Sequence, residues 1–271
     1  MRILAATESG EVGVPSEDWC AAATGLVVVL DGATARTETG CVHGVAWYAR
    51  HLGACIVDLA GDRDVPLTGV LRAAITETAQ AHLHTCDLTH PGTPSAGVGI
   101  LRDTADHWEY LVLGDVSVAV AAAAGEKVIS DERVGATAPD ERAEANGYLI
   151  GSPEKQAALL RMKHGELAAR NRVGGYWIAA ADSAAADHAI TGAVPKPGIK
   201  AMSVLTDGAV RAVEFGLLDW TQLFAVLHDK GPGELLRIVR QAEESDPLGV
   251  RWPRNKKSDD ATAVYLPSSG L

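Results

Sequence analysis

The chain has 271 residues, of which 47% are hydrophobic and 22% are charged, so it can bury one substantial core. Its 24 basic residues against 35 acidic ones give a formal net charge of −11, which argues against a nucleic-acid partner because phosphate backbones attract basic surfaces. No apolar run of about 18 uncharged residues is present and the start lacks a signal-peptide pattern, so we expect a cytoplasmic protein without a membrane partner.

The first half of the chain is predicted to begin with a buried strand and two helices. The β-branched run at residues 26–30 indicates a buried strand that ends at Asp31-Gly32. Apolar residues at helical spacing predict amphipathic helices at about 43–59 and 67–86. An antiparallel meander should follow, with strands at 97–101, 108–113, 116–123 and 127–129.

The second half is predicted to add three helices and three strands. Ser152 as N-cap and Pro153 at the first helical position indicate a helix that runs to about residue 169. Strands are expected at 176–180 and 201–205, and the second leads into Asp207-Gly208. The last expected elements are helices at 219–228 and 232–244 and a strand at 261–266.

Antiparallel strands interrupted by helix pairs favour an α+β fold with helices on the outer faces of layered sheets. A dinucleotide-binding or P-loop fold is not indicated, because neither glycine-rich phosphate motif occurs. No internal repeat or low-complexity linker divides the chain. We therefore expect residues 1–271 to form one domain.

Four acidic motifs lie where a predicted strand meets a loop: Asp31-Gly32, Gly114-Asp115, Asp207-Gly208 and Asp259-Asp260. Carboxylates at strand ends are a common way to hold hard divalent cations over a rigid sheet. Asp31 could bridge two cations, and the Gly32 carbonyl could approach one of them because glycine has no side chain. Asp207 and Asp259 would complete a dinuclear site in which an acidified water attacks phosphorus. Taken singly, each Asp-Gly pair is equally an ordinary turn signal.

Five motifs in chain order carry a family resemblance: Ser16-Glu17-Asp18, Asp31-Gly32-Ala33, Gly114-Asp115, Thr206-Asp207-Gly208 and Ser258-Asp259-Asp260-Ala261-Thr262. Together they resemble the metal-dependent serine/threonine protein phosphatases of type 2C, in their bacterial form, over nearly the whole chain. The resemblance implies a four-layer α-β-β-α sandwich, in which helix pairs flank two mostly antiparallel sheets. It also implies two Mn²⁺ or Mg²⁺ ions at one end of the sandwich.

The resemblance implies roles for individual residues. Asp31 would bridge both metals, the Gly32 carbonyl would bind the second, and Asp207 and Asp259 would bind the first. Three further residues would act around this pair of ions, with Glu17 and Asp18 holding metal-bound waters and Asp115 helping to bind a third metal.

The sequence departs from the family pattern at several positions. Gly13 stands where an arginine usually grips the substrate phosphate, and Arg36 is the nearest substitute, although a solvated loop charge is the competing interpretation. Ala33 replaces a histidine that acts as a general acid in some members, so a metal-bound water would protonate the leaving group. Arg211 replaces an acidic residue that some members use for a third metal.

These features support one leading function and two alternatives. The leading hypothesis is dephosphorylation of phosphoserine and phosphothreonine proteins, or of small phosphoesters. A catalytically weak or inactive relative that binds phosphoproteins is the alternative indicated by Gly13. A two-metal nuclease would also need three strand-end carboxylates, but the acidic charge balance opposes it. A haloacid-dehalogenase-type phosphatase is excluded because Ala33 stands where that chemistry needs a second aspartate.

The cysteines and histidines give no strong metal signal. The four cysteines contain no Cys-x-x-Cys pair and are expected to be reduced structural thiols. His82, His84 and Cys86 crowd the end of the second helix, and His82 and Cys86 share a face. Two ligands do not make a zinc site, so a structural or surface role is expected for these residues.

Overall fold

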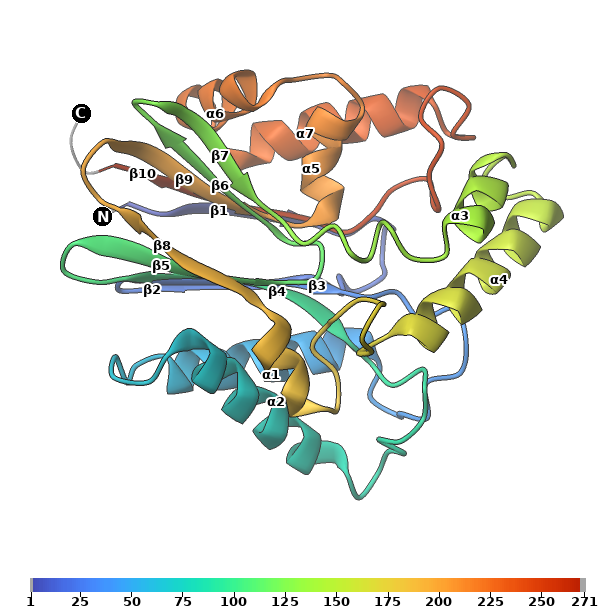
Figure 1. Ribbon diagram of the computed structural model, residues 1–271. Helices are drawn as coiled ribbons and strands as arrows, with labels where there is room; N and C mark the ends of the chain where they lie inside the picture. The colour runs from blue at the N-terminus through green and yellow to red at the C-terminus, as the bar shows by residue number, and fades with distance from the viewer. Residues whose placement is uncertain (1, 269–271) are drawn as a thin grey trace.

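The computed structural model describes residues 2–268 and contains two five-stranded antiparallel sheets packed face to face (Figure 1). The first sheet has the order β1-β10-β9-β6-β7, with β1 at Leu4–Glu8, β10 at Ala261–Pro267, β9 at Ile199–Leu205, β6 at Ser117–Ala122 and β7 at Gly125–Ile129. The second has the order β2-β3-β4-β5-β8, with β2 at Trp19–Ala23, β3 at Leu26–Gly32, β4 at Ala96–Asp103, β5 at His107–Leu113 and β8 at Ile190–Pro195.

Helices cover both outer faces of this sandwich (Figure 1). Two helices, α1 (Val45–Leu59) and α2 (Leu67–His82), pack on the second sheet, together with the short 3-10 helix η1 (Ser183–His188). Three others pack on the first sheet: α5 (Asp207–Glu214), α6 (Trp220–Asp229) and α7 (Pro232–Ser245). The predicted α+β, four-layer α-β-β-α architecture is therefore confirmed.

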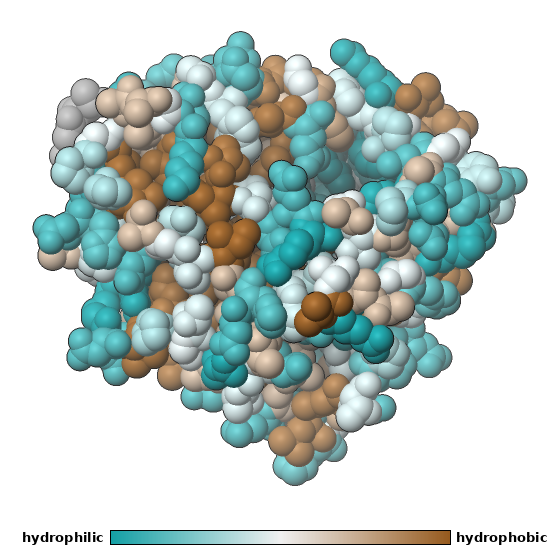
Figure 2. All heavy atoms as spheres, viewed as in Figure 1, coloured by the Kyte–Doolittle hydropathy of each residue, from teal (hydrophilic) through white to brown (hydrophobic). Residues whose placement is uncertain are grey.

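A further helix pair, α3 (Pro139–Asn146) and α4 (Pro153–Ala169), lies beside one end of the sandwich (Figure 1). Ser152 accepts a hydrogen bond from the Lys155 backbone N–H, so the predicted N-cap of α4 is confirmed. Hydrophilic residues cover most of the face shown in Figure 2, and apolar residues gather in its upper left part. None of the helices within residues 2–268 is both long enough and apolar enough to cross a membrane.

Strand β3 shows why the chain has an uninterrupted apolar run at residues 26–30. Val28 and Leu30 pack toward α1 and α2, whereas Val27 and Val29 pack against the first sheet. Because alternate side chains of a strand point to opposite faces, a strand covered on both faces is apolar throughout. This central strand therefore holds its last residues, Asp31 and Gly32, in a fixed position at the end of the sandwich.

The predicted meander is divided between the two sheets. Strands β4 and β5 pair in the second sheet, whereas β6 and β7 pair in the first. The chain changes sheets at Gly114-Asp115, where Gly114 has φ 78°, a conformation that favours glycine. The crossing places Asp115 between the two sheets rather than in a hairpin turn.

Other expectations need correction. Residues 176–180 were expected to form a strand, but they contribute only single bridges, Ala96 to Ala179 and Arg170 to Tyr176. The second helix ends at His82 rather than near residue 86, because the chain turns after it. Asp207 begins a helix rather than a loop, which places its carboxylate at the favourable end of the α5 dipole. The elements β1, β2, β8, α3 and α5 were not predicted.

Candidate metal and phosphate site

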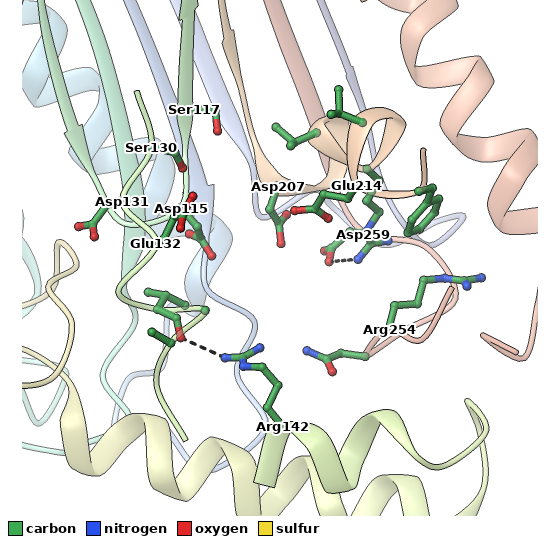
Figure 3. Close-up of a pocket in the computed structure, with 18 of the residues that line it drawn as sticks. Asp115, Ser117, Ser130, Asp131, Glu132, Arg142, Asp207, Glu214, Arg254 and Asp259 are labelled. Atoms are coloured by element: carbon green, nitrogen blue, oxygen red, sulfur yellow. Dashed lines mark hydrogen bonds and ion pairs between the residues drawn. The ribbon is translucent and has the colours of Figure 1, made fainter. Parts of the chain in front are cut away.

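The fold brings together four aspartates that are far apart in the sequence. Asp31 lies at the end of β3, Asp115 at the crossing between the sheets, Asp207 at the start of α5 shortly after β9, and Asp259 just before β10. All four line a hollow of about 160 Å³. Asp115, Asp207 and Asp259 also line a neighbouring hollow of about 830 Å³, where Asp115 faces the other two from the opposite side (Figure 3). The predicted meeting of strand-end carboxylates therefore occurs at one end of the sandwich.

Close backbone contacts hold the segments of this acidic cluster together. The backbone N–H of Asp207 donates to Asp31 Oδ2 at 3.1 Å. A Cβ atom on Gly32 would lie 2.4 Å from the Glu17 carbonyl oxygen, and one on Gly208 would lie 2.0 Å from the Asp260 carbonyl oxygen. Only glycine allows this approach, so these glycines set the spacing between the acidic segments.

The carboxylates lie in an environment that disfavours their charged forms. Burial raises the pKa of Asp31 well above its usual value, and the neighbouring carboxylate of Asp207 raises it further. Burial and the Asp259 carboxylate act in the same direction on the pKa of Asp207. Burial also raises the pKa of Asp115, against a lowering hydrogen bond from its own backbone. A divalent cation would relieve this repulsion, so the donor set suits a hard cation.

Asp259 differs from the other acids because protein cations already contact it. Arg211 donates from Nη2 to Asp259 Oδ2 at 2.7 Å, and Lys256 forms an ion pair with Asp259 Oδ1. Arg211 also pairs at 2.6 Å with Glu243, which is fully buried. Arg211 thus places a positive charge beside the cluster, at the position where the family resemblance implies an acidic residue in some members.

The carboxylates of Asp115, Asp207 and Asp259 lie around the larger hollow rather than meeting at a point (Figure 3). Within residues 2–268, no three of the four aspartates have one oxygen atom each within 4.8 Å of the others, whereas the ligand atoms of Cys41, His82 and Cys86 satisfy this distance. Binding of an ion by Asp31, Asp207 and Asp259 together would therefore require side-chain movement, and the ion would compete with Arg211 and Lys256 for Asp259.

Glu17 and Asp18, the residues expected to hold metal-bound waters, lie just outside the hollow. Thr34 donates to Glu17 Oε2 at 2.9 Å. Thr206 donates to Asp18 Oδ2 at 2.8 Å, but Asp18 Oδ1 is buried without a hydrogen-bond partner in the described part of the chain. Burial raises the pKa of Asp18 to about 7. An acceptor oxygen left without a donor is the feature expected of a carboxylate that binds a water.

The two acids of the Asp259-Asp260 motif have different partners. Asp260 accepts from the backbone N–H of Gly10 at 2.8 Å and from that of Glu17 at 2.6 Å. It therefore fastens the segment before β2 to the segment before β10, while Asp259 faces the hollow.

Four cationic side chains line the same hollow as the aspartates: Arg36, Arg142, Lys163 and Lys256. Arg142 on α3 pairs with Glu166 at 2.8 Å. Arg36 has no ion-pair partner among residues 2–268, and burial lowers its pKa. Gly13, by contrast, lies in an exposed turn with φ 82°. Arg36 thus lies where a phosphate-binding group is needed, and that role stays a prediction.

Sequence reasoning missed several residues of the site. Arg142 lies on α3 and Lys163 on α4. No sequence motif indicates that this helix pair packs beside the strand ends. Lys256 lies in the loop before β10, where it contacts Asp259 and donates to Thr34 at 2.9 Å. Its spacing of three residues before Asp259 was the one available signal.

Comparisons with known proteins identify the fold. No family model matches the sequence, and a search of curated proteins finds no significant match. The structure of the serine/threonine phosphatase PstP/Ppp of Mycobacterium tuberculosis is similar at 12% identity and a TM-score of 0.61, over 98% of this chain and 97% of that one. The catalytic domain of PstP in complex with two manganese ions is similar at 13% identity and a TM-score of 0.56, over 98% and 97%.

A third similar structure is the serine/threonine phosphatase Stp1 of Staphylococcus aureus, at 10% identity and a TM-score of 0.57, over 99% of this chain and 95% of that one. The chain therefore has the fold of the bacterial type 2C serine/threonine phosphatases, as the sequence motifs predicted. At these identities the likeness concerns the fold, and the roles of individual residues stay predictions.

Proposed function

We propose that this protein is a metal-dependent phosphatase that hydrolyses phosphomonoesters, with phosphoserine and phosphothreonine side chains of proteins as the substrate class. The observation that carries the proposal is the juxtaposition of buried, mutually repelling carboxylates with Arg36 in one hollow. Buried carboxylates that repel one another are suitable ligands for divalent metal ions. The Arg36 guanidinium is a suitable partner for a negatively charged phosphoryl group. The fold shared with phosphatases, one of them holding two manganese ions, is consistent with this proposal.

The proposed cofactors are two Mn²⁺ or Mg²⁺ ions. The ions would be held by Asp31, the Gly32 carbonyl and Asp207. Asp259 would become a further ligand when the metal competes successfully with Arg211 and Lys256 for its carboxylate. When bound, such ions supply Lewis acidity and lower the pKa of a coordinated water. Asp115 is proposed as the ligand of a third ion, since no protein cation pairs with it in residues 2–268.

Glu17 and Asp18 are proposed to orient waters at the edge of the metal site. Asp18 has one buried oxygen free for such a water, because Thr206 engages only the other oxygen. Thr34 and Lys256 form a chain of hydrogen bonds that leads to Glu17, which holds the Glu17 carboxylate in place. These contacts position the two acids without making them metal ligands.

The substrate phosphate is proposed to contact Arg36 and Lys163. The hollow of about 160 Å³ is small, so it suits a phosphoryl group and the first atoms attached to it, with the rest of a protein substrate outside. No histidine lines this hollow in the described residues, so the leaving group would receive its proton from water, as Ala33 in place of histidine predicts.

The test is hydrolysis of p-nitrophenyl phosphate and of phosphoserine and phosphothreonine peptides with Mn²⁺ or Mg²⁺. Asp207→Asn should lower kcat at least roughly 100-fold, because it removes a metal ligand. Asp140→Asn is the matched control, since Asp140 also lies in the first turn of a helix but is exposed. Turnover of none of these substrates with either metal would refute the proposal.

One observation favours a second function, that of a phosphoprotein-binding module with little or no activity. Arg211 and Lys256 both neutralise Asp259, so the protein already supplies part of the positive charge that a metal would bring. Calorimetric titration with Mn²⁺ separates the two functions. Two sites that weaken in Asp31→Asn support the phosphatase, whereas phosphopeptide binding without metal binding supports the module.

A further inference from the structure

Three possible ligands for a soft metal ion converge away from the carboxylate cluster. Cys41 lies in the segment between β3 and α1, His82 is the last residue of α2, and Cys86 lies in the turn that follows. Their ligand atoms all lie within 4.8 Å of one another. Cys41 Sγ is 2.8 Å from Cys86 Sγ and 3.5 Å from His82 Nδ1, and both cysteines are free thiols. The sequence predicts that His82 and Cys86 share a helix face, but no sequence pattern indicates that Cys41 lies close to them.

The backbone around the three residues holds them in place before any ion binds. The backbone N–H of Cys86 donates to the His82 carbonyl at 3.0 Å, so the chain turns back toward the end of α2. The N–H of Asp87 donates to the Gly40 carbonyl at 2.8 Å, which joins this turn to the segment that carries Cys41. Thr39 Oγ1 accepts from the Cys41 N–H at 3.2 Å and fixes the cysteine backbone. Preorganised ligands lower the entropic cost of binding.

The imidazole of His82 is unusual because it is buried without full hydrogen bonding. Only 2% of the residue is exposed. Its Nε2 has no hydrogen-bond partner in residues 2–268, and its Nδ1 faces Cys41. The rings of Trp47 and Tyr48 lie around it, with ring centroids 5.1 Å and 6.4 Å away. The His82 Nδ1 makes no strong hydrogen bond and lies beside the Cys41 thiol, so it is available as a nitrogen ligand for a metal ion.

We propose that Cys41, His82 and Cys86 bind one Zn²⁺ ion, with water at the fourth coordination position. Two thiolates and one imidazole are ligands that Zn²⁺ accepts in tetrahedral geometry. Binding would release the two thiol protons to solvent and form two Zn–S bonds and one Zn–N bond, with no change of oxidation state. Two sulfurs on one zinc lie about 3.8 Å apart when each Zn–S bond is about 2.3 Å, so the thiols would separate by roughly 1 Å.

The ion would fasten a functionally placed segment to the helical layer. Residues 33–44 run from the end of β3, where Asp31 and Gly32 lie, to the start of α1, and they carry Arg36. Zinc at Cys41 would tie the far end of this segment to α2. The proposed ion would therefore brace this segment, and its binding does not depend on the phosphatase proposal.

The experiment titrates the full chain, reduced with a phosphine and stripped of metal, with Co²⁺ in the presence of excess Mg²⁺. Cobalt bound by thiolates gives a charge-transfer absorption that carboxylate ligands do not give, so the Asp31 cluster stays silent in this readout. One equivalent of Co²⁺ should produce the band, and one equivalent of Zn²⁺ should remove it. The band should be lost in Cys86→Ser and in Cys41→Ser. It should persist in the control Cys20→Ser/Cys55→Ser, which changes the other two partly buried cysteines.

Circular dichroism checks that each variant is folded, and His82→Asn provides a third variant that leaves both thiols intact. Absence of the band in the reduced wild-type chain would overturn the proposal. A band that survives Cys41→Ser/Cys86→Ser would overturn it as well. A Cys41–Cys86 disulfide found by peptide mass spectrometry, together with no zinc binding after reduction, would instead identify a redox pair. Because no assay of hydrolysis enters the test, its failure is distinguishable from failure of the phosphatase proposal.

Discussion

Arg211 contacts Asp259 from one turn along the helix that begins with Asp207. Its Nη2 donates to Asp259 Oδ2 at 2.7 Å, while its Nη1 donates at 2.6 Å to Glu243. The helix that supplies one candidate metal ligand therefore also supplies a cation that neutralises another. A metal ion has to compete with this arginine, and with Lys256, for the same carboxylate.

Removing the weaker competitor should strengthen metal binding. Lys256 pairs with Asp259, and its side chain is 31% exposed, so Lys256→Gln should fold normally. We expect Mn²⁺ to bind about threefold to tenfold more tightly, because a partly exposed ion pair contributes roughly 1 kcal/mol. Isothermal titration calorimetry measures the change. Lys257→Gln, at the exposed neighbouring lysine, should leave Mn²⁺ affinity as it is. Equal or weaker binding in Lys256→Gln would show that the ion pair between Lys256 and Asp259 does not oppose Mn²⁺ binding.

Removing Arg211 should instead cost stability. Glu243 is fully buried, and it would keep only Arg240, which pairs with it at 2.8 Å. Breaking a buried ion pair from one side costs about 3 kcal/mol, so Arg211→Met should lower the free energy of unfolding by roughly that amount. Urea denaturation followed by circular dichroism gives the value. Arg237→Met removes an exposed ion pair on α7 and should change stability by less than about 1 kcal/mol. Similar losses in both variants would contradict this account of Arg211.

The fold and the acidic half of the site could be predicted because they depend on local patterns. The run at residues 26–30 is apolar at every position because β3 is covered on both faces, and the strand that it predicts ends at Asp31. Asp207 and Asp259 likewise flank apolar strands of the same sheet. A carboxylate that directly adjoins a buried strand can be located from the sequence, because the strand fixes where its ends lie.

The cationic half could not be predicted, because tertiary packing places it. Lys163 lies on α4, whose position beside the strand ends results from its packing with α3 rather than from any pattern in residues 153–169. Cys41 and His82 are 41 residues apart in the sequence, with α1 and most of α2 between them. No local spacing in the sequence indicates that they come into contact. Strand β1 was missed because its side chains are half-buried or exposed, so it lacks the apolar run that marks β3.

Stability of the metal-free chain should fall as pH rises toward neutrality. Burial raises the pKa of Asp18 from 3.8 to about 7 in the folded state. Between these two pH values, the Asp18 carboxyl group is protonated in the folded chain and ionised in the unfolded chain. Its contribution to the stability of the folded state is therefore fully present below pH 3.8 and is lost as pH rises to about 7.

The expectation is tested by measuring the free energy of unfolding of the metal-free protein, by chemical denaturation, at several values between about pH 5 and pH 8. Asp18→Asn should reduce the slope of stability against pH, whereas Asp140→Asn, at an exposed carboxylate, should not. Saturating Mn²⁺ should also reduce the slope, because a nearby cation favours the charged carboxylates. An unchanged slope in Asp18→Asn would show that Asp18 does not titrate in this range.

The glycine after Asp207 should be essential for the spacing of the site. A Cβ on Gly208 would lie 2.0 Å from the carbonyl oxygen of Asp260, which is backbone and cannot rotate away. Gly208→Ala should therefore push the start of α5 from the segment before β10, at a cost of about 1–3 kcal/mol. Since Asp207 and Asp259 adjoin these two segments, Mn²⁺ affinity and phosphatase activity should fall together with stability.

Gly233→Ala provides a matched control, because Gly233 is likewise the second residue of a helix, α7, and a Cβ there meets nothing within 4 Å. Alanine should leave stability unchanged or raise it by up to about 1 kcal/mol, because glycine loses more backbone entropy on folding. Thermal denaturation and Mn²⁺ titration of both variants measure the contrast. If Gly208→Ala matched the control in both measurements, the contact with Asp260 would not set the distance between Asp207 and Asp259. If it lost stability but kept full Mn²⁺ affinity, the two aspartates would not bind a common ion.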